Sequence, residues 1–277
     1  MIDLHTHSTV SDGSETPERV VEMAAAAGLS ALALTDHDRL DGVEAARRRA
    51  GEVGVELVAG CELSCQHPGT MHVLVYFLEP GAGPLQDELA GLQEGRQDRN
   101  RQMVARLGLL GLPVTWDEVV VEAGGTGIGR PHVAAVLVDK GVVATVQEAF
   151  DTWLGKGSPG YVARTRLAPA RALDLARASG AVPVLAHPLS LGGDGAALAG
   201  ALRELAGLGL AGVEALYGRY TDAERARVAA AGRAAGLVVT GGSDYHGTYK
   251  PDLEVGTGRG DLAVPDDALT ALRDART

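Results

Sequence analysis

Two histidines, His5 and His7, stand one residue apart in the opening stretch MIDLHTHSTVSDGS. We expect a short strand here. Successive side chains of a strand point to opposite faces, so both imidazoles project the same way and Thr6 projects the other way. Two imidazoles aimed at one point can hold a metal ion. The pair alone is equally compatible with surface histidines, so the rest of the chain must decide between these interpretations.

Further metal-ligating side chains occur beside later apolar runs. His37 ends the second run, Glu62 the third and His187 the fifth, Asp244 and His246 end the seventh, and His72 lies near the start of the fourth. Histidines of an ordinary core would not favour one end of successive strands, whereas a polynuclear metal site needs ligands that converge from separate elements. Nitrogen and oxygen ligands without thiolate suit zinc, manganese or iron alike.

Other polar residues receive simpler interpretations. We expect His67 to lie exposed in a loop, and Cys61 and Cys65 to be structural. Three aspartates around the second run, Asp36, Asp38 and Asp41, are expected to support neighbouring ligands or to cap a helix rather than to touch a metal.

Apolar runs rich in branched residues alternate with alanine-rich stretches, a pattern typical of parallel βα units. Strands are predicted at residues 1–6, 30–36, 55–62, 70–78, 181–188, 211–218 and 237–244. Helices are predicted at 16–29, 41–54, 194–209 and 221–236, each ending near a glycine. Active groups of α/β barrels gather at one end of the strands, which is where this pattern places the candidate ligands.

The segment from residue 80 to 166 breaks the alternation with a long polar helix and further helical stretches. We interpret it as a mostly helical insertion between the fourth and fifth strands, which lies over the site and selects the substrate. The predicted organisation is therefore a first barrel part at 1–79, the insertion at 80–166 and a second barrel part at 167–277.

Composition excludes several classes of function. The 36 acidic residues exceed the 25 basic ones, so the net charge of −11 argues against a partner of duplex DNA. No run reaches the roughly 20 apolar residues that span a bilayer, so we expect no membrane insertion. Two cysteines are too few for a disulfide framework, which favours the cytoplasm. Oligomeric state is not predicted.

Five motifs in order, DLHTHSTVSDG, TDHD, GCELS, LAHP and GSDYHG, resemble the PHP (polymerase and histidinol phosphatase) family of metal-dependent phosphoesterases. The insertion, with GRPHVA and GKGSPGYV, resembles a bacterial subgroup that hydrolyses nucleotide phosphates and whose relatives trim short RNA. The resemblance implies an α/β fold, a distorted seven-stranded (β/α)7 barrel that carries a helical insertion.

The resemblance also implies two to three divalent metal ions. The first would be held by His5, His7, Glu62 and Asp244, the second by Glu62, His72 and His187, and the third by Asp12, His37 and His246. Glu62, Asp244 and His187 are the implied catalytic residues. Asp12 stands where several relatives carry histidine, so the third position departs from the family's pattern.

The activity implied is hydrolysis of nucleotide phosphomonoesters, 3',5'-bisphosphonucleotides or nucleoside monophosphates, by a metal-bound hydroxide. Arg130, His132, Lys156 and Arg164 of the insertion are the candidate phosphate contacts. Three alternatives stay open: a 5'-3' exoribonuclease on short RNA, a histidinol phosphate phosphatase, and a non-catalytic regulatory module that binds metal.

Overall fold

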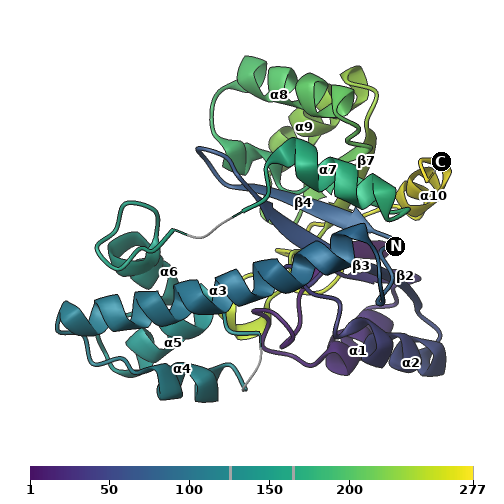
Figure 1. Ribbon diagram of the computed structural model, residues 1–277. Helices are drawn as coiled ribbons and strands as arrows, with labels where there is room; N and C mark the ends of the chain where they lie inside the picture. Colours follow the sequence, from purple (N-terminus) through teal and green to yellow (C-terminus); the bar gives the residue numbers. More distant parts are fainter. Residues whose placement is uncertain (125–126, 164–165, 277) are drawn as a thin grey trace.

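The computed structural model describes residues 1–124, 127–163 and 166–276, and it contains a seven-stranded sheet that curls into a nearly closed barrel (Figure 1). The strands are β1 (Ile2–Thr6), β2 (Ala31–Leu34), β3 (Glu56–Cys65), β4 (Met71–Tyr76), β5 (Val182–Leu185), β6 (Gly212–Tyr217) and β7 (Val238–Gly242). They neighbour one another in chain order, which confirms the predicted fold class.

One strand runs against the others. β3 pairs with β4 antiparallel and β4 with β5 antiparallel, whereas all other pairs are parallel, so the expectation of uniformly parallel βα units was wrong at β4. The reason is the short connection after Cys65, which can close a hairpin but cannot make a crossover. The reversal places His72, opposite Ser64, at the same barrel end as the carboxyl ends of the parallel strands. Glu62 lies within β3, not at its end.

The barrel closes where the segment after β7 meets β1. The Asp244 amide donates to the carbonyl of His5 at 2.8 Å, and the His7 amide donates to the carbonyl of Tyr245 at 3.0 Å. A Cβ at Gly242 would lie 2.4 Å from the Cβ of His5, so the two backbones can approach this closely only because position 242 is glycine. The closure brings the first and last predicted ligands of the sequence side by side.

Helices cover the barrel from outside. They are α1 (Pro17–Ala26), α2 (Val43–Val53), α7 (Pro169–Ala178), α8 (Gly195–Gly207), α9 (Asp222–Ala234) and α10 (Asp267–Asp274). Thr16 caps α1, and Thr221 caps α9 in a capping box with Glu224, which explains why these helices begin where the sequence predicts. The four helices expected between strands are confirmed as α1, α2, α8 and α9.

The insertion consists of α3 (Pro84–Leu109), α4 (Trp116–Glu122), α5 (Arg130–Asp139), α6 (Val146–Ala149) and a π-helix at Phe150–Leu154. Leu85 and Leu89 of α3 pack in the core between the barrel and its helices, whereas Met103 and Leu107 pack in a separate core of the insertion. The single helix α3 therefore contributes to both cores and connects the barrel to the insertion (Figure 1). No helix in the described ranges is both long and apolar enough to cross a membrane.

Candidate metal centre

Four side chains, from β1, β3 and the residues that follow β1 and β7, converge at the barrel end where β1 and β7 meet. The Nε2 atoms of His5 and His7 lie 3.1 Å apart, and each lies 3.2–3.4 Å from Oε2 of Glu62 and Oδ1 of Asp244. A tetrahedral ion with bonds of about 2.1 Å would hold its ligands about 3.4 Å apart. All four side chains are buried, and their donor atoms fit the ligand shell of one divalent cation.

Glu62 lies among imidazoles on both sides of its carboxylate. In addition to His5 and His7, Oε2 faces Nδ1 of His37 at 3.2 Å. Its other oxygen, Oε1, faces Nδ1 of His72 at 2.8 Å and Nε2 of His187 at 3.0 Å. The carboxylate therefore reaches two groups of nitrogen donors at once, an arrangement that suits a carboxylate bridging two cations.

A third group forms around Asp12, His37 and His246. Oδ1 of Asp12 lies 3.6 Å from Nε2 of His246, and Oδ2 lies 3.8 Å from Nε2 of His37. Within the described part of the chain, Oδ1 of Asp12 is buried without a hydrogen-bond partner. A buried acceptor of this kind is costly to leave unsatisfied, so a cation fits here as well.

The electrostatics keep the carboxylates ionised. Burial alone would raise the pKa of Glu62, but the imidazoles of His72, His37 and His5 outweigh it and hold that pKa well below its usual range. Burial lowers the pKa of His246, to about 3, so its ring is neutral. Burial would also lower the pKa of His7, but its hydrogen bonds to Asp244 and Glu62 outweigh burial and raise that pKa to about 9, so a cation bound there would displace the proton of this ring.

A buried carboxylate on β6, Glu214, supports two of the candidate ligands. Oε1 of Glu214 lies 2.9 Å from Nδ1 of His5, and Oε2 accepts the backbone N–H of His187 at 2.8 Å. His187 has a φ of 27°, in the left-handed region that side chains rarely occupy, so this hydrogen bond helps hold a strained residue. Sequence analysis missed Glu214, although a carboxylate inside the apolar run AGVEALYG was a usable signal.

Asp244 is oriented by two side chains that donate hydrogen bonds to its Oδ2 atom. Oδ2 accepts from the Tyr217 hydroxyl at 2.7 Å and from Nζ of Lys250, which leaves Oδ1 to face the histidines. Asp244 also has a positive φ, of 57°. The two partners and the strained backbone fix which oxygen faces the cluster.

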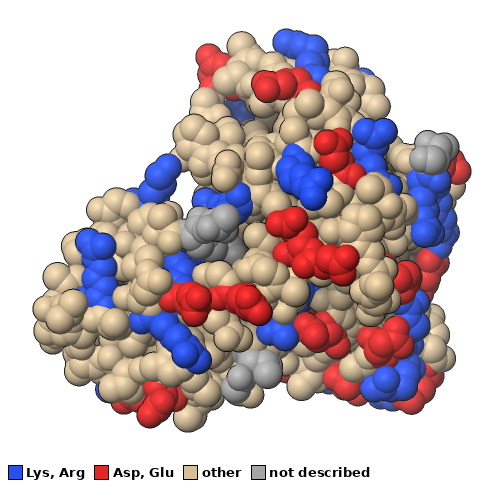
Figure 2. All heavy atoms as spheres, in the orientation of Figure 1, with Lys and Arg blue, Asp and Glu red and all other residues tan. Residues whose placement is uncertain are grey.

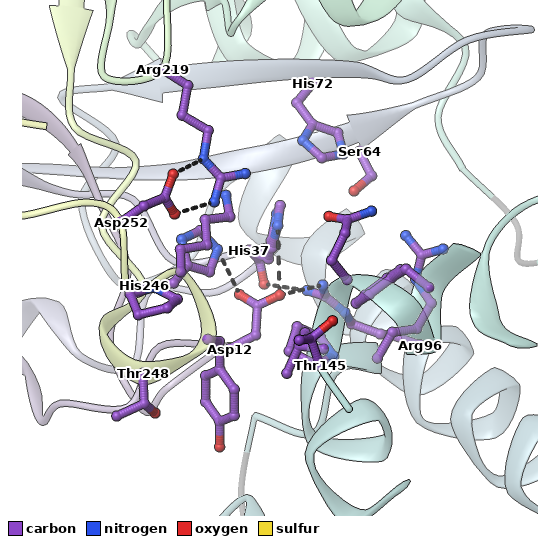
Figure 3. Close-up of a pocket in the computed structure, with 18 of the residues that line it drawn as sticks. Asp12, His37, Ser64, His72, Arg96, Thr145, Arg219, His246, Thr248 and Asp252 are labelled. Carbon is purple, nitrogen blue, oxygen red and sulfur yellow. Dashed lines mark hydrogen bonds and ion pairs between the residues drawn. The ribbon is translucent and has the colours of Figure 1, made fainter. Parts of the chain in front are cut away.

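The cluster opens into a cavity of about 630 Å³ between the insertion and the barrel. Asp12, His37, His72 and His246 lie in its wall, which also carries six basic side chains: Arg96, Arg99, Arg130, Arg166, Arg219 and Lys250. Arg219 is held by two hydrogen bonds to Asp252, at 3.1 and 2.6 Å (Figure 3). The visible surface carries Lys, Arg, Asp and Glu side chains interspersed with one another (Figure 2). The acidic chain thus concentrates positive charge at one cavity, which suits an anionic ligand.

The four candidate phosphate contacts have different positions. Arg130 lines the cavity, with its guanidinium over the ring of Phe150. His132 is buried, and its Nδ1 accepts the Gly129 amide at the start of α5. Lys156 donates to a backbone carbonyl of the barrel. Neither His132 nor Lys156 is among the described residues that line the cavity, and Arg164 falls outside the described residues.

Comparisons with known proteins place the chain among related sequences and structures. The PHP domain family matches residues 3–104. The chain is 31% identical over 259 residues to a 3',5'-nucleoside bisphosphate phosphatase of Chromobacterium violaceum, covering 92% of this chain and 90% of the relative. It is 30% identical to a 5'-3' exoribonuclease of Haemophilus influenzae, covering 88% and 89%. A solved structure from Bifidobacterium adolescentis, assigned to the metal-dependent phosphoesterases, superposes with a TM-score of 0.87 at 29% identity, covering 99% and 96%.

Proposed function

This chain belongs to the PHP family of metal-dependent phosphoesterases, and we propose that it hydrolyses nucleotide phosphomonoesters, either 3',5'-bisphosphonucleotides or nucleoside monophosphates. The proposal rests on the observation that two features occur in the wall of one cavity. Members of the imidazole and carboxylate cluster form one part of the wall, and six basic side chains lie elsewhere in the same wall. The first feature suits cations and the second suits a substrate with more than one negative group.

Two to three divalent ions, of manganese, zinc or iron, are proposed for the cluster. His5, His7, Glu62 and Asp244 would hold the first, Glu62, His72 and His187 the second, and Asp12, His37 and His246 the third. Ions held there would neutralise phosphoryl oxygens and lower the pKa of a coordinated water. The donor distances around Glu62, and the unsatisfied oxygen of Asp12, support this assignment.

The chain's own residues have distinct proposed roles. Glu62, Asp244 and His187 form the proposed catalytic set, because they would hold the ions that supply positive charge to the phosphate. Arg130, Arg219 and Lys250 bind phosphate oxygens from the cavity wall, since guanidinium and ammonium groups pair strongly with phosphate. His132 is proposed to act by fixing the start of α5, where Arg130 stands. Roles for Lys156 and Arg164 stay predictions from the sequence.

A second candidate function is 5'-3' trimming of short RNA, which the likeness to the Haemophilus influenzae exoribonuclease favours. The same cations would serve in that reaction. We propose the cytoplasm as the compartment, since the two cysteines of the sequence are too few for a disulfide framework.

A substrate panel tests the proposal. Metal-stripped protein is reloaded with manganese, zinc or iron in turn and given 3',5'-bisphosphoadenosine, AMP, histidinol phosphate or a short 5'-phosphorylated RNA. We expect phosphate release from the bisphosphate or the monophosphate, and none from Asp244→Asn. Preferential cleavage of the RNA would favour the exoribonuclease, preference for histidinol phosphate would favour that phosphatase, and metal binding without any turnover would favour a regulatory module.

A further inference from the structure

Asp36, in the segment that follows β2, is a buried carboxylate distinct from the candidate metal ligands. Its Oδ1 atom accepts the backbone N–H of Ser8 at 2.8 Å and the hydroxyl of Ser11 at 2.6 Å. Its Oδ2 atom accepts the hydroxyl of Ser8 at 2.7 Å. Both oxygens of this carboxylate are therefore engaged by the turn that follows β1.

These hydrogen bonds fix the course of that turn. Within it, the carbonyl of Ser8 accepts the amide of Ser11 at 3.1 Å and the amide of Gly13 at 2.9 Å. A Cβ at Gly13 would lie 2.6 Å from the carbonyl oxygen of His7, so the chain folds back this closely only because residue 13 is glycine. The turn carries Asp12, whose place beside the third group of donors therefore depends on the hydrogen bonds that anchor the turn.

Ser11 also connects Asp36 to the ring of a candidate ligand, His7. The Ser11 hydroxyl oxygen lies 3.4 Å from Nδ1 of His7. A serine hydroxyl has one proton, and Ser11 donates it to Asp36, so its oxygen can only accept a hydrogen bond from His7. Oδ1 of Asp12, 3.8 Å from the same Nδ1, favours a hydrogen on that nitrogen too. The favoured tautomer therefore has hydrogen on Nδ1 and its lone pair on Nε2, which faces Oδ1 of Asp244 at 3.4 Å.

We propose that Asp36 is a positioning residue of the metal centre: it keeps the hydroxyls of Ser8 and Ser11 as donors, which directs Nε2 of His7 towards the first cation and holds Asp12 for the third. Carboxylates behind a metal-binding histidine fix its tautomer and its ring orientation, and Asp36 does so through Ser11. This inference rests on the metal centre of the proposed function and is independent of which ester is the substrate.

The test compares wild-type protein with Ser11→Ala, Asp36→Asn and the double variant. The matched control is Asp41→Asn, which removes a carboxylate that is 59% exposed from the same segment. Mn²⁺ titration of metal-stripped protein gives the affinity of each ion. Long-range ¹H–¹⁵N NMR of the Zn²⁺-loaded protein shows which ring nitrogen of His7 carries a proton, with His7→Gln identifying the signal. Circular dichroism checks that each variant folds.

We expect Zn²⁺ on Nε2 of His7 and a proton on Nδ1 in wild-type protein, and an Nδ1 proton that exchanges with water about tenfold faster or more in Ser11→Ala. Asp36→Asn should weaken at least one Mn²⁺ ion by about 10–100-fold, and Ser11→Ala by about tenfold. The double variant should bind Mn²⁺ within about twofold of Asp36→Asn, because the two residues act in one chain of contacts. Asp41→Asn should match wild type.

A proton on Nε2 of His7 with Zn²⁺ on Nδ1 in wild-type protein would overturn the proposal. Losses that multiply in the double variant would also overturn it, because they would show that Asp36 and Ser11 act separately. If Asp36→Asn does not fold, Ser11→Ala decides, since it keeps the carboxylate and its contacts with Ser8, and metal affinity equal to the control would then refute the proposal. If wild-type protein releases no phosphate from any ester, the proposed function fails instead, while both metal readouts still test the role of Asp36.

Discussion

Replacing Glu214 by glutamine tests whether a buried carboxylate on β6 sustains metal binding at two positions. The change keeps the shape of the side chain but removes its charge. In the wild-type protein Oε1 of Glu214 lies 2.9 Å from Nδ1 of His5, and Oε2 accepts the His187 amide at 2.8 Å. The variant loses the charge-assisted contact with His5 and can lose the hydrogen bond to His187. The variant therefore disturbs one candidate ligand of each of the first two ions.

The size of the effect follows from these two contacts. Carboxylates that hold the far nitrogen of a metal-binding histidine typically contribute about 10–100-fold in metal affinity. This corresponds to about 1.4–2.8 kcal/mol. Because Glu214 contacts a ligand of each ion, we expect losses of this size at both positions, with a smaller loss in kcat once Mn²⁺ saturates.

The assay is a titration of metal-stripped protein with Mn²⁺ against a chelator of known affinity. Glu204→Gln, at an exposed position of α8, is the matched control and should bind Mn²⁺ as wild type does. Metal affinities of Glu214→Gln within about twofold of the control would refute the argument, since they would show that His5 and His187 keep their orientation without the carboxylate.

Three further predictions concern other parts of the molecule. Tyr217→Phe removes the 2.7 Å hydrogen bond to Asp244 and should weaken Mn²⁺ binding about 3–10-fold, measured in the same titration. Burial lowers the pKa of His132 from 6.5 to about 4, so the unfolded chain binds a proton first as the pH falls. Its contribution to stability is present above about pH 6.5 and is lost towards pH 4, by up to about 3 kcal/mol. Urea unfolding at pH 7 and pH 4.5 should therefore show a smaller difference for His132→Gln than for wild type, and an equal difference would contradict this. Leu107→Ala creates a cavity in the core of the insertion and should lower the free energy of unfolding by about 2–5 kcal/mol, whereas a loss below about 1 kcal/mol would show that this core is not tightly packed.

The sequence predicts the barrel well because each strand is a short apolar run bounded by helix signals. It does not predict the direction of β4, because strand direction depends on the connection and not on the composition of the strand. The missed reversal of β4 affected the predicted position of one candidate ligand. His72 stands at the start of its run, at the wrong end for a parallel strand, and only the reversal of β4 brings it to within 2.8 Å of Glu62.

Residues that act across the fold were harder to predict than the candidate ligands. Glu214 carries no local motif, and its importance comes from contacts with residues far away in sequence. His132 illustrates the converse. Its place in GRPH suggests a phosphate contact, but its ring caps the helix on which Arg130 reaches the cavity. Spacing along the chain indicates which residues share an element, whereas only the packed fold shows which surfaces of two elements face each other.

The central claim is that one carboxylate, Glu62, joins two groups of imidazoles into a single metal centre. The most direct measurement counts the Mn²⁺ ions bound per chain after equilibrium dialysis of metal-stripped wild-type protein and Glu62→Gln. The geometry around both oxygens of Glu62 predicts at least two ions for wild type and fewer than one for the variant. An equal number of ions in the two proteins would contradict the account.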